Sequence, residues 1–81
     1  MVRVLLFGKL RDVAGWRERS CTPAPASLLA LKAMICADDP ALAQALAAPG
    51  VQAAVDRVLA REDTPLHEGS EVAFMPAMSG G

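Results

Sequence analysis

The residues of this chain with the most distinctive chemistry stand at its end, in the segment FMPAMSGG (Phe74–Gly81). Gly80 and Gly81 have no side chains, so a narrow channel on another protein can admit them. An α-carboxylate on Gly81 is a poor electrophile, but adenylation by ATP converts such a group into an activated acyl group. Sulfide can then displace AMP and leave a thiocarboxylate, which is a strong nucleophile; a persulfide gives the same product once a thiol has reduced the S–S bond of the acyl disulfide that it forms. The end of the chain is therefore the first candidate for a reactive group.

The residues before these glycines are suited to carry them into a deep pocket. Residues 76–81 have no charge and no regular hydrophobic period, whereas disordered tails are usually polar and often charged. Pro76 offers no backbone donor and so ends strand pairing cleanly, and six extended residues reach about 20 Å at ~3.3–3.6 Å each. Glycine is common in frayed termini, but here the pair follows a strand, a proline and an uncharged spacer. We therefore predict a domain over residues 1–75 and a flexible tail over residues 76–81.

Two strands are predicted to position this tail. Residues 2–7 (VRVLLF) and residues 70–75 (SEVAFM) are short runs rich in β-branched and aliphatic side chains. Alternation along the last strand points Val72 and Phe74 toward a helix and Met75 the other way. In the first strand, alternation places three side chains on one face and three on the other: Val2, Val4 and Leu6 against Arg3, Leu5 and Phe7.

The middle of the chain supplies the helices and a hairpin. Residues 9–15 read as a short turn or a single helical turn, and residues 16–21 as a polar strand. Ser27 is a good N-cap for a helix whose Leu28, Leu31 and Ile35 recur at helical spacing. Asp38, Asp39 and Pro40 end that helix, and residues 41–47 form a second short one. Residues 51–55 and 58–61 flank Asp56-Arg57, which fits a two-residue hairpin turn without the favoured glycine, and residues 64–69 form a turn.

This order of elements predicts the fold class. A hairpin packed against one main helix, with the first and last strands side by side, is the simplest compact solution. We therefore predict an α+β fold of the β-grasp (ubiquitin-like) type, with a mixed sheet of about five strands packed on one main helix plus short helices.

Composition excludes several classes of function. The chain has 81 residues, 53% of them hydrophobic and 21% charged, which indicates one globular domain. A net charge of −1 argues against nucleic-acid binding, and no apolar stretch is long enough to span a membrane. Cys21 and Cys36 are too few for a disulfide scaffold and, with His67, do not match a zinc spacing. We expect a cytoplasmic protein with no metal site and no bound cofactor, in which both cysteines are structural.

Three segments together resemble a known family. The sequences VLLFGKLRDVAG, TPLHEGSEVAF and FMPAMSGG are similar to those of the MoaD-type sulfur carriers, the small subunits of molybdopterin synthase, and the resemblance covers essentially the whole chain. It implies that an E1-like adenylating enzyme activates Gly81 with ATP and that sulfur is then installed as a thiocarboxylate. The loaded tail would enter the large synthase subunit and give sulfur to cyclic pyranopterin monophosphate. The chain would then be a sulfur donor in a heterotetramer, with the catalytic pocket on the large subunit.

A docking surface for that partner can be predicted from the strands. Phe7 and Met75 lie on the outer faces of the first and last strands, so they become neighbours if these strands pair. We expect Leu59 to join them from the hairpin. Exposed apolar side chains of this kind usually mark interfaces, although packing in the core is the alternative for all three. The resemblance adds a basic position, Arg11, whose alternative is a solvated charge. It also adds the tail residues Pro76, Met78 and Ser79 as partner contacts.

The sequence departs from the family at two positions and leaves other functions open. Pro76 is followed by Ala77 where the family usually has a second proline, and Asp56 stands in the hairpin turn where the family often has Asn. The alternatives are a sulfur carrier for thiamine, cysteine or tRNA thiolation, a ubiquitin-like modifier that forms an isopeptide bond through Gly81, and a β-grasp binding module without covalent chemistry.

Overall fold

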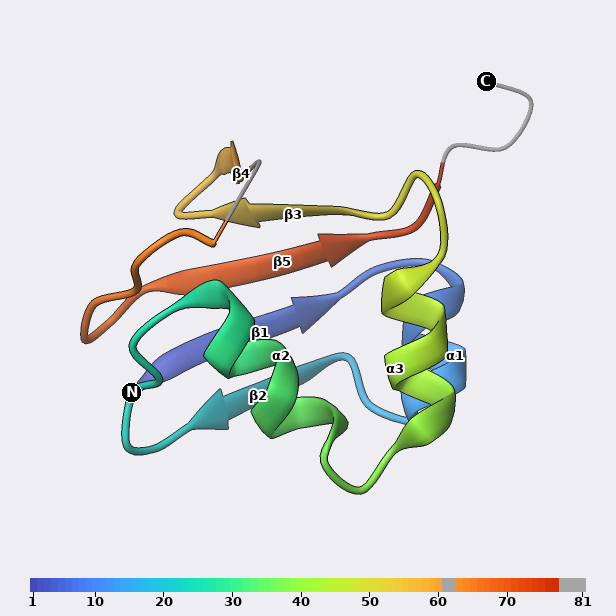
Figure 1. Cartoon of the computed structure of the whole chain (residues 1–81), viewed down its shortest axis with the longest axis horizontal. Helices are drawn as coiled ribbons and strands as arrows, with labels where there is room; N and C mark the ends of the chain where they lie inside the picture. Colours follow the sequence, from blue (N-terminus) through green and yellow to red (C-terminus); the bar gives the residue numbers. More distant parts are fainter. Residues whose placement is uncertain (61–62, 78–81) are drawn as a thin grey trace.

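β1 (Val2–Leu6) and β5 (Glu71–Met75) lie side by side and run in the same direction at the centre of a five-stranded sheet (Figure 1). The computed structural model describes residues 1–60 and 63–77. The strand order is β2-β1-β5-β3-β4, and every neighbouring pair other than β1 and β5 is antiparallel. The remaining elements are α1 (Lys9–Ala14), β2 (Glu18–Cys21), α2 (Leu28–Cys36), α3 (Pro40–Ala47), β3 (Gln52–Val55) and β4 (Val58–Ala60). This arrangement confirms the predicted β-grasp fold.

One face of the sheet forms the core with the helices. Alternation along β1 and β5 buries the predicted set of strand side chains, Val2, Val4, Leu6, Val72 and Phe74. The helices contribute Leu10, Leu28, Leu31, Ile35, Leu42 and Leu46 to the same cluster. Each buried aliphatic or aromatic side chain stabilises the fold by about 1.5–3 kcal/mol relative to an exposed one. The core therefore depends on a small number of large side chains, all on the helical side of the sheet.

α2 begins with its backbone N–H groups satisfied by two separate segments. As predicted, the Ser27 hydroxyl accepts a hydrogen bond at 3.2 Å from the N–H three residues later. The carboxylate of Asp63 accepts from the Leu29 N–H at 2.8 Å, and the carbonyl of Thr64 accepts from the Leu28 N–H at 2.8 Å. Asp63 and Thr64, which is the first residue of the segment predicted as a plain turn, thus also hold the start of α2 in place.

Most predicted boundaries differ from the structure by one or two residues, and at two of them the difference changes the role of a side chain. Asp39 was expected only to end α2, but its side chain accepts a hydrogen bond at 3.0 Å from the Leu42 N–H, so it is the N-cap of α3. β2 begins at Glu18 and not at Trp16. Trp16 instead packs against the core, and the guanidinium of Arg19 lies 4.3 Å from the centre of its ring. A cation over an indole face is a favourable contact. Trp16 therefore packs between the core and the Arg19 side chain.

The β3–β4 turn has left-handed backbone at both central residues. Asp56 has φ 49° and Arg57 has φ 71°, which is the conformation that a two-residue hairpin loop requires. The Asp56 side chain accepts from the Glu71 N–H at 2.9 Å, and its own N–H donates to the Glu71 carbonyl at 2.8 Å. Asp56 therefore joins the hairpin to the start of β5, whereas Arg57 adopts a costly conformation.

We predict that Arg57→Gly stabilises the protein. A non-glycine residue in left-handed backbone costs about 1–2 kcal/mol, and the larger unfolded-state entropy of glycine offsets about 0.5–1 kcal/mol of that. The expected gain of about 0.5–1 kcal/mol corresponds to a rise in melting temperature of roughly 2–8 °C for a domain of this size. Thermal unfolding followed by circular dichroism measures it. Arg57→Ala is the control, since it removes the side chain without relieving the backbone, and an equal gain in that variant would contradict the prediction.

Candidate functional site

The face of the sheet opposite the helices is open, since no element among the described residues packs on it. The strand registers place Leu5, Ala73, Ala54 and Leu59 in one row across four strands. The first three are half-buried by their neighbours in the sheet, and Leu59 is 57% exposed. An apolar row therefore crosses the open face.

Phe7 and Met75 extend this row toward the end of β5. Leu6 is the register partner of Phe74, and the Phe7 N–H donates to the Phe74 carbonyl at 3.1 Å. Continuing the register by one residue places Phe7 beside Met75, as the sequence predicts, and Phe7 is 45% exposed. We call the six residues Leu5, Phe7, Ala54, Leu59, Ala73 and Met75 the apolar patch. Their role in binding a partner remains a prediction.

The opposite end of the open face is charged at Arg3 and Glu71, and Glu18 lies beside Leu5 at the β2 edge of the apolar row. The guanidinium of Arg3 on β1 lies 3.3 Å from a carboxylate oxygen of Glu18 on β2 and 3.2 Å from one of Glu71 on β5. These side chains are 44%, 52% and 30% exposed, and exposed pairs of this kind contribute only about 0.2–1 kcal/mol each. Their effect is to make the open face asymmetric, with the apolar patch at the end where the tail begins.

Arg11 lies beside the apolar patch. Together with Leu5, Phe7, Arg17 and Glu18, it lines a shallow hollow of about 240 Å³ at the edge of the open face. The structure thus brings Arg11 and Phe7 to one place, as expected. Arg17 was not predicted to lie on this surface, because in the sequence it is only a charged residue in a polar segment just before β2.

The tail begins next to the apolar patch. Met75 is the last residue of β5, Pro76 is half-buried, and Ala77 is exposed. The predicted site residues Met78, Ser79, Gly80 and Gly81 lie outside the residues that the structure describes. The described part of the site is therefore the apolar patch, Arg11 and the first two residues after β5.

Both cysteines are in surroundings that disfavour reactive thiolates. Cys21 is buried in the core cluster and Cys36 is half-buried on α2, and neither forms a disulfide. Burial raises the pKa of the Cys21 thiol, and burial together with the nearby Asp39 carboxylate raises the pKa of the Cys36 thiol. A raised pKa lowers the fraction of nucleophilic thiolate, so the electrostatics agree with the structural role predicted for them.

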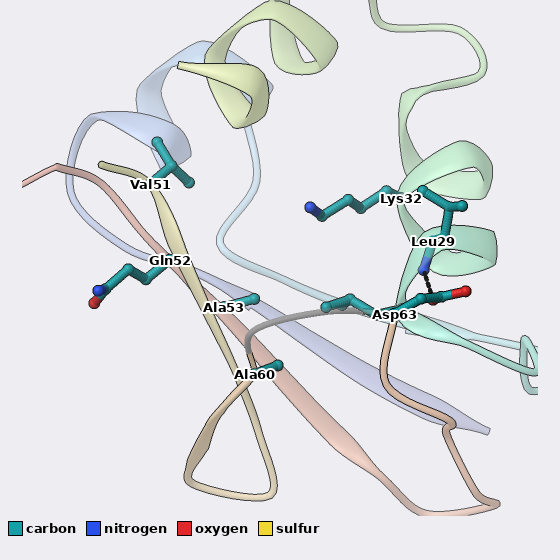
Figure 2. Close-up of a pocket in the computed structure, with 8 residues that line it drawn as sticks. Leu29, Lys32, Val51, Gln52, Ala53, Ala60 and Asp63 are labelled. Carbon is teal, nitrogen blue, oxygen red and sulfur yellow. Dashed lines mark hydrogen bonds between the residues drawn. The ribbon is translucent and has the colours of Figure 1, made fainter. Parts of the chain in front are cut away.

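A hollow lies between α2 and the β3–β4 hairpin (Figure 2). It has a volume of about 260 Å³ and is lined by Lys32, Asp63 and mostly apolar neighbours. Figure 2 shows the Asp63 carboxylate turned to the Leu29 N–H, to which it is hydrogen-bonded at the start of α2. The carboxylate therefore stabilises the helix, and among the described residues no second carboxylate and no histidine lines the hollow.

Residues 1–60 and 63–77 provide neither a metal site nor a membrane-spanning helix. Within these ranges no group of three or more His, Cys, Asp or Glu side chains is placed to hold a metal ion. None of the helices in the described chain combines the length and apolar character needed to cross a membrane.

Comparison with known proteins identifies the family and agrees with the fold. The sequence profile described as the ThiS family matches residues 4–81. The chain belongs to this family. A curated relative, the molybdopterin synthase sulfur carrier subunit of Escherichia coli (strain K12), is 33% identical over 81 residues, which are 100% of both chains. The alignment thus spans the whole of residues 1–81.

Solved structures show the same fold. The small archaeal modifier protein 1 of Methanosarcina acetivorans has a TM-score of 0.86 and 21% identity, over 99% of this chain and 95% of that one. The protein of the same description from Haloferax volcanii has a TM-score of 0.81 and 22% identity, over 99% of this chain and 98% of that one. At these identities the similarity establishes the ubiquitin-like β-grasp fold and does not extend to function.

Proposed function

We propose that this chain is the sulfur carrier subunit of a molybdopterin synthase. The observation that carries the proposal is the full-length relationship, at 33% identity, to a molybdopterin synthase sulfur carrier subunit. The ThiS family match, which runs to residue 81, supports it. The exposed apolar patch beside the start of the tail supports it as well, because a carrier must dock on a partner while its tail reaches that partner's pocket.

The proposed chemistry takes place at the Gly81 carboxylate. One carboxylate oxygen attacks the α-phosphorus of ATP on an E1-like enzyme, which forms an acyl-adenylate and releases pyrophosphate. A sulfur donor equivalent to sulfide attacks the carbonyl carbon, AMP leaves, and a thiocarboxylate remains. On the large subunit this sulfur is transferred to cyclic pyranopterin monophosphate, and water restores the carboxylate. Because every step takes place on a partner, the chain itself needs only an accessible tail and a docking surface.

The apolar patch is the proposed docking surface for the large subunit. Interface cores are apolar and depleted in charge, whereas their rims are polar. The patch has this composition, with Arg11 and Glu18 at one edge and the Arg3–Glu71 pair at the far end. A complex of two such carriers with a dimer of large subunits would leave each tail beside one catalytic pocket.

We predict that Leu59→Arg weakens binding to the large subunit. The new charge would lie at the end of the apolar row and would have to be desolvated in the complex, which should raise the dissociation constant at least about tenfold, or about 1.4 kcal/mol. Leu29→Arg is the matched control, because Leu29 is 64% exposed but lies on α2, on the helical side. Isothermal titration calorimetry with both variants measures the difference.

Two outcomes would contradict this docking surface. One is a dissociation constant for Leu59→Arg within twofold of that of the unmodified chain. The other is an equal loss of affinity in Leu29→Arg. Matching circular dichroism spectra and melting temperatures for the two variants would show that each retains the fold, since both leucines are on the surface.

We predict that deleting Gly80 and Gly81 abolishes sulfur transfer and leaves the fold intact. The described core lies within residues 2–74, so the deletion leaves all of these residues in place, and the melting temperature should change by less than about 2 °C. The assay is formation of molybdopterin from the pterin precursor with the large subunit, an adenylating enzyme, ATP and a sulfur donor.

The same reconstitution separates the alternative functions. A loaded chain that fails to form molybdopterin but serves thiamine or tRNA thiolation would show a different sulfur recipient. Gly81 linked to lysine side chains of other proteins would show a protein modifier. Full activity of the deletion variant would overturn the carrier proposal and leave a binding module.

A further inference from the structure

Two glycines lie against the first residues of the tail, one on each side of β5. Gly8 lies between β1 and α1, and Gly50 lies between α3 and β3. Because β5 is flanked by β1 and β3 in the sheet, these two loops flank the point where the chain leaves β5 (Figure 1). A Cβ added to Gly8 would lie 2.8 Å from Pro76 Cγ, and a Cβ added to Gly50 would lie 2.8 Å from Ala77 Cβ.

Both distances are too short for two carbon atoms, whose optimal separation is about 3.5–4.0 Å. Gly8 and Gly50 also have positive φ, 57° and 86°, which glycine adopts readily. Gly15 and Gly69 have positive φ of 81° and 88°, but a Cβ on either would meet nothing within 4 Å. The first pair is therefore distinguished from the second by its contact with the tail and not by its backbone.

The loops that carry the two glycines are themselves held in place. The carbonyl of Gly8 accepts a hydrogen bond at 3.1 Å from the Arg11 N–H in the first turn of α1. On the other side, the Val51 N–H donates to the Ala48 carbonyl at 3.3 Å, which closes the turn around Gly50. In Figure 1, α1 and α3 lie together at the end of the sheet where β1 and β5 finish. Both loops thus offer fixed surfaces to the residues between them.

We propose that Gly8 and Gly50 are positioning residues that hold Pro76 and Ala77 and so set the direction in which the tail leaves the domain. We call this pair the glycine cradle. Its consequence rests on the proposed function: a tail whose first two residues are already ordered loses less conformational entropy when it enters a partner's pocket. The cradle is a property of the free chain, so it can be measured without a partner.

The test is the backbone ¹⁵N–¹H NOE of Ala77, measured by NMR in the full chain. In the unmodified chain and in the controls Gly15→Ala and Gly69→Ala, this NOE should be close to the values in β5. In Gly8→Ala and Gly50→Ala it should fall clearly below them, because the new methyl group displaces the tail. All four variants place alanine at positive φ, so the backbone cost that they share lowers every melting temperature and cannot explain the difference.

Second-site variants make the test independent of general destabilisation. Ala77→Gly removes the colliding Cβ and leaves a Cα at 3.5 Å from the added atom, so combined with Gly50→Ala it should restore the NOE of residue 77 to that of Ala77→Gly alone. Pro76→Ala removes Cγ and Cδ and leaves Cβ at 3.9 Å, and it should likewise rescue Gly8→Ala. The proposal is overturned by a low NOE in the unmodified chain, by an equal fall in the controls, or by a failure of both rescues.

A second measurement relates the cradle to function. Gly8→Ala and Gly50→Ala should weaken binding to the adenylating enzyme and to the large subunit about tenfold more than the control variants do. If the unmodified chain is never loaded with sulfur but residue 77 behaves as described, the proposed function fails and the cradle stands. If the chain is loaded but residue 77 is as mobile as in the variants, the cradle fails and the proposed function stands.

Discussion

The parallel pairing of β1 with β5 is the constraint on which the rest of the structure depends. It brings the first and last strands together in the middle of one sheet, and both strands finish at the same end of that sheet. The chain therefore leaves the sheet beside the loop that follows β1, and the apolar side chains at the ends of both strands become neighbours. A different partner for β5 would separate Phe7 from Met75 and remove Gly8 from the start of the tail.

One-sided burial follows from the same pairing. Period-2 alternation places the large aliphatic side chains of β1 and β5 against the helices, and the core uses these few residues to hold a small domain together. The opposite face is then not needed for stability. It can carry charge at one end and apolar side chains at the other, which is a composition suited to docking. Stability and recognition are thus divided between the two faces of one sheet.

The sequence predicted the fold and the exposed members of the apolar patch because both follow from alternation and from the turn residues. It could not predict that Asp63 and Thr64 hold the start of α2, because these contacts join segments more than thirty residues apart in the sequence. It also gave no reason to distinguish Gly8 and Gly50 from Gly15 and Gly69. All four adopt positive φ, and only the tertiary structure shows which of them meet the tail.

The central claim is that the last residue carries sulfur, and the most direct measurement is the mass of the C-terminal peptide. The chain would be isolated beside its native partners, or incubated with ATP, an adenylating enzyme and a sulfur donor. We expect the mass of one sulfur in place of one oxygen, confined by fragmentation to Gly81. An unchanged carboxylate under both conditions would contradict the claim.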